Sequence, residues 1–153
     1  MTLDAADRTA LADLVHRYAA GVDDRQFDCV TDLFTETAEL VLPDPPGELA
    51  PVHMHSGHAE VGAAIAAVAA TIRTEHAIVG EVYEPGPQPD HAGGRIACIA
   101  HHWTQRGDQL TDVVWHLRYD DEYLRTDAGW RFARRTLTIN AIETRPMRQV
   151  RRG

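Results

Sequence analysis

The side chains left to do chemistry in this chain are histidine, carboxylate and tyrosine. The 153 residues include nine histidines and 23 acidic residues but no lysine, which excludes Schiff-base chemistry and a P-loop lysine. The single serine, Ser56, lies in H-S-G-H rather than in the G-x-S-x-G turn of a hydrolase. Cys29 and Cys98 form no CxxC pair, and no G-x-G-x-x-G follows a strand pattern. Covalent acyl transfer and dinucleotide binding therefore lose support.

Three histidines stand close together in the sequence. His53, His55 and His58 form H-x-H-x-x-H, and on a strand His53 and His55 would share one face, as metal ligands often do. His101 or His116 could supply a further ligand. A metal centre is therefore one alternative, and a place at the rim of the fold is the simpler interpretation.

The elements that must position these groups begin with helices. Apolar residues recur at three- and four-residue steps from Leu3 to Val22, the pattern of an amphipathic helix that Asp4 can cap and Gly21 can end. A second, short helix is expected near residues 27–34.

The rest of the chain favours strands. We expect, in order, a strand at 39–42, a proline-rich loop at 43–51 that could act as a lid, a helix at 58–73, and strands at 76–83, 95–105, 110–124 and 129–142. Helices followed by hairpin-linked strands predict one α+β domain with a curled, mainly antiparallel sheet.

Charge and hydropathy indicate which classes of partner the protein does not bind. A formal net charge of −8 argues against nucleic acid. From Arg131 onward the chain carries seven arginines, which we interpret as a solvated strand face and a frayed tail. No run approaches about 18 apolar residues and the opening residues do not resemble a signal peptide, so we expect a cytoplasmic protein that does not bind membranes.

Four segments together resemble a known family. They are R-Y-A-A-G-V-D-D-R-Q-F-D-C-V-T-D-L-F-T at 17–35, G-H-A-E-V-G-A-A-I at 57–65, R-T-E-H-A-I-V-G at 73–80 and D-A-G-W-R-F-A-R-R-T-L at 127–137. In this order they resemble the SnoaL-like branch of the NTF2-like superfamily, which includes scytalone dehydratase. The resemblance implies a cone of three N-terminal helices packed on a curled sheet over residues 1–145, with a basic tail at 146–153.

The resemblance also implies a site. An aspartate after the first helix faces a histidine that opens a later strand, with a second histidine one strand further on, and these match Asp23, His76 and His101. The family's tyrosine before the aspartate and asparagine on a late strand are replaced by Val22 and Tyr119. The residues expected to bind substrate are Tyr18, Arg73, Tyr119 and Trp115.

These inferences favour a cofactor-independent lyase or isomerase, similar to a dehydratase or cyclase, that acts on a small cyclic or polyketide-like carbonyl compound. A histidine can remove and return a proton at neutral pH, and a carboxylate fixes its tautomer. One alternative is a non-catalytic ligand-binding module or the small subunit of a ring-hydroxylating oxygenase. Another is a metal-dependent enzyme that uses His53, His55 and His58. We expect a homodimer, with a trimer as the other possibility.

Overall fold

The computed structural model describes residues 2–153. The helical elements are α1 (Ala5–Asp23), α2 (Phe27–Thr31), α3 (Gly57–Ala66) and the 3₁₀ turn η1 (Ala67–Ala70). The strands are β1 (Phe34–Asp44), β2 (Glu48–Ser56), β3 (Arg73–Pro85), β4 (His91–Arg106), β5 (Gln109–Thr126) and β6 (Gly129–Met147). Within the described residues no helix is long and apolar enough to cross a membrane.

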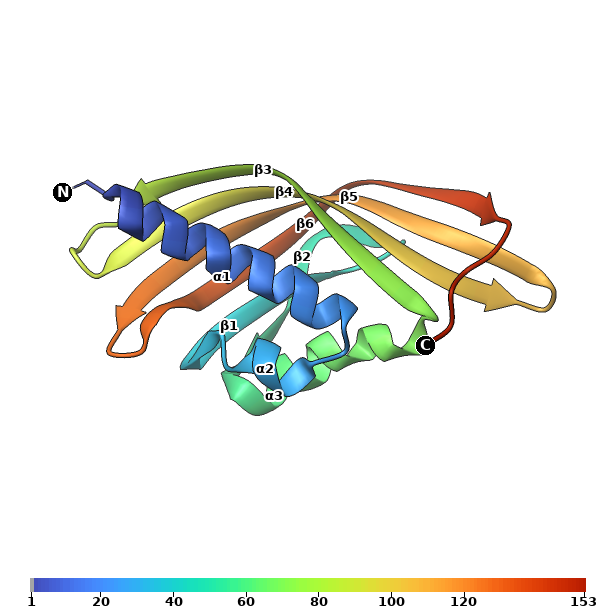
Figure 1. The fold of residues 1–153 in the computed structure, drawn as a ribbon, viewed down its shortest axis with the longest axis horizontal. Helices are drawn as coiled ribbons and strands as arrows, with labels where there is room; N and C mark the ends of the chain where they lie inside the picture. Colours follow the sequence, from blue (N-terminus) through green and yellow to red (C-terminus); the bar gives the residue numbers. More distant parts are fainter. Residues whose placement is uncertain (1) are drawn as a thin grey trace.

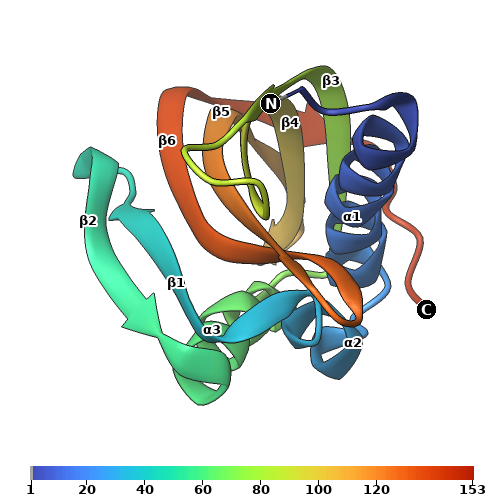
Figure 2. The same cartoon turned by 90° about the vertical axis from the view of Figure 1, so that its left-hand side faces the viewer.

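One curled sheet forms the body of the molecule. Its strand order is β2-β1-β6-β5-β4-β3, and only the β1–β6 pair is parallel. Helix α1 lies along the sheet beside β3, and α2 and α3 lie together below one edge (Figure 1). The end-on view shows the strands curving around the side on which the helices lie (Figure 2). This α+β cone is the predicted fold.

Helix α1 begins as predicted but ends later. Asp4 and Asp7 form a reciprocal capping box, which satisfies otherwise free backbone N–H groups. The helix continues through Gly21 to Asp23, so the predicted end at Gly21 is wrong. A Cβ on Gly21 would lie 2.5 Å from Cγ2 of Val30, so this glycine allows α2 to pack closely. The result is that Asp23 occupies the last helical position.

The proline-rich stretch is a hairpin and not the predicted loop. Strands β1 and β2 pair antiparallel on both sides of a turn at residues 45–47. Pro51 is tolerated because β2 is an edge strand, where a missing N–H need not break a ladder. Residues 43–51 are therefore part of the sheet edge and not a free loop.

The later elements differ from prediction mainly in length. The third helix ends at Ala66 and continues only as η1, and β3 already starts at Arg73. The four predicted long strands are present and each extends further, with β6 reaching Met147 beyond the predicted boundary at 145. Six neighbouring strands, each twisted, allow the sheet to curl around a cavity.

Candidate active site

A cavity of about 410 Å³ lies between the helices and the concave face of the sheet. Helix α3 and η1 contribute Ala64, Ile65, Ala67 and Val68 to its wall. The sheet contributes apolar side chains from β1, β5 and β6, together with two histidines from β3 and β4. The volume falls within the range of small-molecule sites, and a mostly apolar wall with few polar groups is typical of them.

His76 and Asp23 form a hydrogen-bonded pair at this cavity. Nδ1 of His76 lies 2.7 Å from Oδ1 of Asp23. The same carboxylate accepts hydrogen bonds from the Thr74 hydroxyl at 2.9 Å and from the His76 backbone N–H at 2.8 Å. The His76 side chain is 7% exposed and that of Asp23 20% exposed. Three donors from β3 therefore fix a carboxylate at the end of α1.

This geometry sets the tautomer of His76. An ionised carboxylate only accepts hydrogen bonds, so Nδ1 of His76 carries the proton and Nε2 has a free lone pair. His76 lines the cavity, and within residues 2–153 no side chain hydrogen bonds to its Nε2. A neutral imidazole held in this way can act as a base, and Asp23 stabilises the imidazolium that forms.

The second histidine in the cavity is His102 and not the predicted His101. His102 is 7% exposed and lines the cavity, with its ring 6.2 Å from that of His76. Its Nδ1 donates to the Val113 carbonyl at 2.9 Å, which leaves Nε2 as an acceptor. Burial lowers the pKa of His102, so this imidazole stays neutral at physiological pH.

His101 lies on the opposite face of β4, because adjacent residues of a strand point to opposite faces. Its Nδ1 lies 2.7 Å from Oδ2 of Asp112, and its ring stacks against Trp103 at 5.9 Å. His101 is therefore bonded to an aspartate as His76 is, but His76 lines the cavity and His101 does not.

Three of the four residues predicted to bind substrate line the cavity. They are Tyr18, Trp115 and Tyr119. Arg73 instead lines an outer cleft together with Asp23, Glu75 and Trp103, because it points to the other face of β3 from His76. Arg73, the fourth residue predicted to bind substrate, therefore lies outside this cavity.

The histidine cluster does not converge. His58 Nε2 donates to the Phe34 carbonyl at 2.9 Å, and His53 lies 3.8 Å from Asp44 near the hairpin turn. In the described part of the chain, no three histidine, cysteine or acidic side chains come together as metal ligands would. The arrangement of His53, His55 and His58 gives no support to the metal-dependent alternative.

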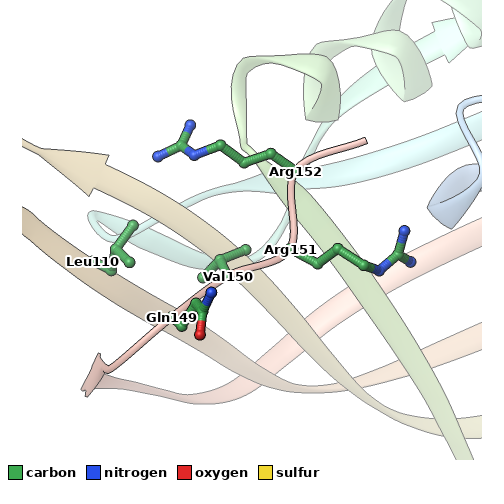
Figure 3. A pocket seen from close by; sticks show the side chains of 5 residues that line it. All are labelled: Leu110, Gln149, Val150, Arg151 and Arg152. Carbon is green, nitrogen blue, oxygen red and sulfur yellow. The ribbon is translucent and has the colours of Figure 1, made fainter.

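Two other features are poor candidates for chemistry. A hollow of about 800 Å³ lies beside Leu110 and residues 149–152, but the side chains of Arg151 and Arg152 point away from each other (Figure 3). They therefore do not converge on a ligand. Cys98 is buried, and this burial raises its pKa to about 12, so its thiol stays protonated and unreactive.

Several solved structures share this fold with the chain. The chain is 27% identical to a candidate aromatic ring hydroxylase from Novosphingobium aromaticivorans, with a TM-score of 0.77 over 94% of this chain and 95% of that one. It is 28% identical to the Kfla4162 protein from Kribbella flavida, with a TM-score of 0.74 over 90% and 93%. A candidate scytalone dehydratase from Novosphingobium aromaticivorans is 19% identical, with a TM-score of 0.75 over 96% and 91%, and this likeness shows the fold alone.

The sequence itself places the chain in a family. No curated protein matches it. Residues 4–136, however, match the SnoaL-like domain. This range contains Asp23 and every residue that lines the cavity except Leu137. The chain therefore belongs to the SnoaL-like domain family, as its four sequence segments predicted.

Proposed function

We propose that this protein is a cofactor-independent lyase or isomerase that acts on a small cyclic or polyketide-like carbonyl compound. One observation carries the proposal: His76, oriented by Asp23, shares an apolar cavity with the neutral imidazole of His102. Family membership supports this class of chemistry.

The proposed reaction begins at Nε2 of His76. This nitrogen takes a proton from a carbon next to the substrate carbonyl, and the C–H electron pair moves into an enol or enolate. Asp23 stabilises the resulting imidazolium. In a dehydration the imidazolium returns its proton to a departing hydroxyl, which leaves as water. In an isomerisation it returns the proton to a different carbon.

His102 has a different task in this scheme. Its Nδ1 is held by the Val113 carbonyl, so its free Nε2 accepts a hydrogen bond from a substrate hydroxyl. Burial lowers the pKa of His102, which keeps this nitrogen an acceptor while His76 exchanges protons. In this scheme His76 transfers the proton and His102 orients the substrate, because the two imidazoles lie in different environments.

The test uses proton exchange, which requires no knowledge of the natural substrate. Simple cyclic ketones such as cyclohexanone, 1-indanone and 1-tetralone are incubated with the protein in D₂O, and NMR follows loss of the protons next to the carbonyl. We expect exchange with at least one ketone, and His76→Ala should slow it by about 10²- to 10⁴-fold. His101→Ala is the matched control, because it removes an aspartate-bonded histidine that lies outside the cavity.

The proposal fails if the wild type exchanges no ketone proton, or if His76→Ala exchanges as fast as wild type. It also fails if His101→Ala loses as much activity as His76→Ala. Ketone binding seen by calorimetry without any exchange would favour a non-catalytic ligand-binding module instead.

A further inference from the structure

A charged side chain is buried behind the wall of the cavity. Arg135 on β6 is fully buried, whereas its sequence context predicted a solvated strand face. Its Nε and Nη2 donate to Asp121 at 2.9 and 3.2 Å, and the two residues are direct partners across β5 and β6. Its Nη1 has no hydrogen-bond partner in residues 2–153. A buried charge with a spare donor is costly, so its position calls for an explanation beyond pairing with Asp121.

The guanidinium is stacked against two tyrosines of the cavity wall. Cζ of Arg135 lies 3.6 Å from the ring centre of Tyr119 and 4.3 Å from that of Tyr18. Asp121 does not line the cavity, and its Oδ2 also accepts a hydrogen bond from Tyr123 at 2.7 Å. The negative charge is therefore held behind the arginine, and the positive charge lies against the tyrosines.

The Tyr119 hydroxyl is free to serve a ligand. The hydroxyls of Tyr83 and Tyr123 donate to carboxylates, whereas that of Tyr119 hydrogen bonds to none of the described residues. Burial raises the pKa of Tyr119 well above its ordinary value, so the hydroxyl remains a donor. A cation on the face of a phenol draws electron density from the ring and strengthens the O–H group as a donor.

We propose that Arg135 is a positioning residue that holds Tyr119 as a donor to a substrate oxygen on which negative charge develops. This inference rests on the proposed function and narrows its substrate class. The substrate is a ring compound whose carbonyl oxygen becomes an enolate oxygen beside Tyr119. A donor fixed in advance in a dry cavity stabilises such an oxyanion strongly. A saturated ring that only loses a leaving group has no atom that uses this donor.

The test compares two probes of the same shape and different charge. Binding of 4-nitrophenol, at a pH where it is ionised in water, is measured by calorimetry beside binding of neutral nitrobenzene. We expect the wild type to prefer the phenolate by about tenfold or more, as for a charge-assisted hydrogen bond. Equal affinity for the two probes, or binding of neither, would overturn the inference.

Two variants separate the tyrosine from the arginine. Tyr119→Phe removes only the hydroxyl, and Arg135→Met combined with Asp121→Asn removes both buried charges and keeps an acceptor for Tyr123. Each should reduce the phenolate preference about tenfold while nitrobenzene binding changes little. If the double variant does not fold, Arg135→Lys keeps a charge beside Asp121 but loses the flat stacked group, and should lower the preference at least threefold.

The control is Arg125→Met. Arg125 also pairs with a carboxylate, that of Asp7, and stacks on Trp130 at 4.5 Å, but it lies away from the cavity and should leave the preference unchanged. An unchanged preference in folded Arg135 variants would show that the arginine is only structural.

The inference and the proposed function can fail separately. His76→Ala should keep the phenolate preference while it loses ketone exchange. A wild type that prefers phenolate but exchanges no ketone refutes the proposed function alone. A wild type that exchanges ketones but has no phenolate preference refutes the role of Arg135 and Tyr119 alone.

Discussion

Replacement of Asp23 by asparagine should change the tautomer of His76. Asp23 accepts three hydrogen bonds, from the Thr74 hydroxyl, the His76 backbone N–H and His76 Nδ1. An asparagine has one acceptor oxygen and one donor group at these places. If its NH₂ faces the backbone N–H, two donors oppose each other at about the 2.8 Å now spanned by a hydrogen bond. If its NH₂ faces Nδ1 and the Thr74 hydroxyl, that hydroxyl must accept instead of donating, and Nδ1 can accept only when it gives up its proton.

We expect the second arrangement, because the Thr74 hydroxyl can accept a hydrogen bond from the NH₂, whereas the His76 backbone N–H can only donate. His76 would then carry its proton on Nε2, which could no longer act as a base. The stability cost comes from exchanging charge-assisted hydrogen bonds for neutral ones at a partly buried site, about 2 kcal/mol in all. For a chain of this size that corresponds to a fall in Tm of roughly 4–8 °C.

The assay is NMR of the imidazole nitrogens at about pH 8, above the pKa of about 6.5 of a free imidazole. The His76 signals are assigned by their loss in His76→Gln, and scanning calorimetry gives the change in Tm. Ketone exchange should fall by about 10²- to 10⁴-fold together with the change of tautomer. The reasoning is refuted if Asp23→Asn keeps the proton of His76 on Nδ1, or if exchange is unaffected by the change.

Three further predictions concern stability. Burial lowers the pKa of His102 below the 6.5 of a free imidazole, so the unfolded state takes up a proton at a higher pH than the folded state. The free energy of unfolding should therefore fall as the pH drops below about 6.5, by at most about 1.4 kcal/mol per pH unit. Urea denaturation should show a flatter pH dependence for His102→Gln, and an identical dependence would contradict the assignment. Gly94→Ala should lower the free energy of unfolding by about 1–3 kcal/mol through overpacking, since its Cβ would lie 2.5 Å from the Tyr123 hydroxyl. Gly93→Ala is the control in the same denaturation assay and should lower it less, because its nearest neighbour would lie at 3.7 Å. Asp7→Ala should lose about 1–3 kcal/mol in the same assay, because it removes the capping box and two side-chain hydrogen bonds; a loss under half of the lower figure would mean that water replaces these bonds.

The fold was predictable because its signals are local. The apolar stripe of α1 and the turn residues between β4, β5 and β6 are legible within short windows of sequence. The hairpin at Pro43–Pro51 was missed because proline counts against a strand, and only its place at the sheet edge makes it acceptable. Edge position is a property of the assembled sheet and not of the segment.

The choice between His101 and His102 shows a different limit. Five apolar residues precede them, from Ile96 to Ala100, so the alternation that marks a buried face is hidden. The β4–β5 hairpin contains a usable signal: pairing of Arg106 with Gln109 places His102 opposite Val113. Val113 belongs to the series that continues with Trp115 and Leu117, which is apolar, and this register would have selected His102.

The burial of Arg135 could not be predicted in the same way. Arginine is rarely buried without a partner, and the partner, Asp121, lies on another strand. Its position opposite Arg135 follows a register shift in the β5–β6 pair, which no local pattern reveals. The sequence therefore predicted the Asp23–His76 pair more readily than the buried charge behind the cavity wall.

The residues of α3 and η1 shape the cavity but do not hold the Asp23–His76 pair. Its lining residues include Ala64, Ala67 and Val68, and no residue of η1 is buried. Enlarging or trimming these side chains would change the shape offered to a ligand while Asp23 and His76 keep their hydrogen bonds. Descendants of this chain could therefore acquire new substrates by single exchanges on one short turn, and a directed-evolution library confined to these positions would sample substrate range with little loss of folded protein.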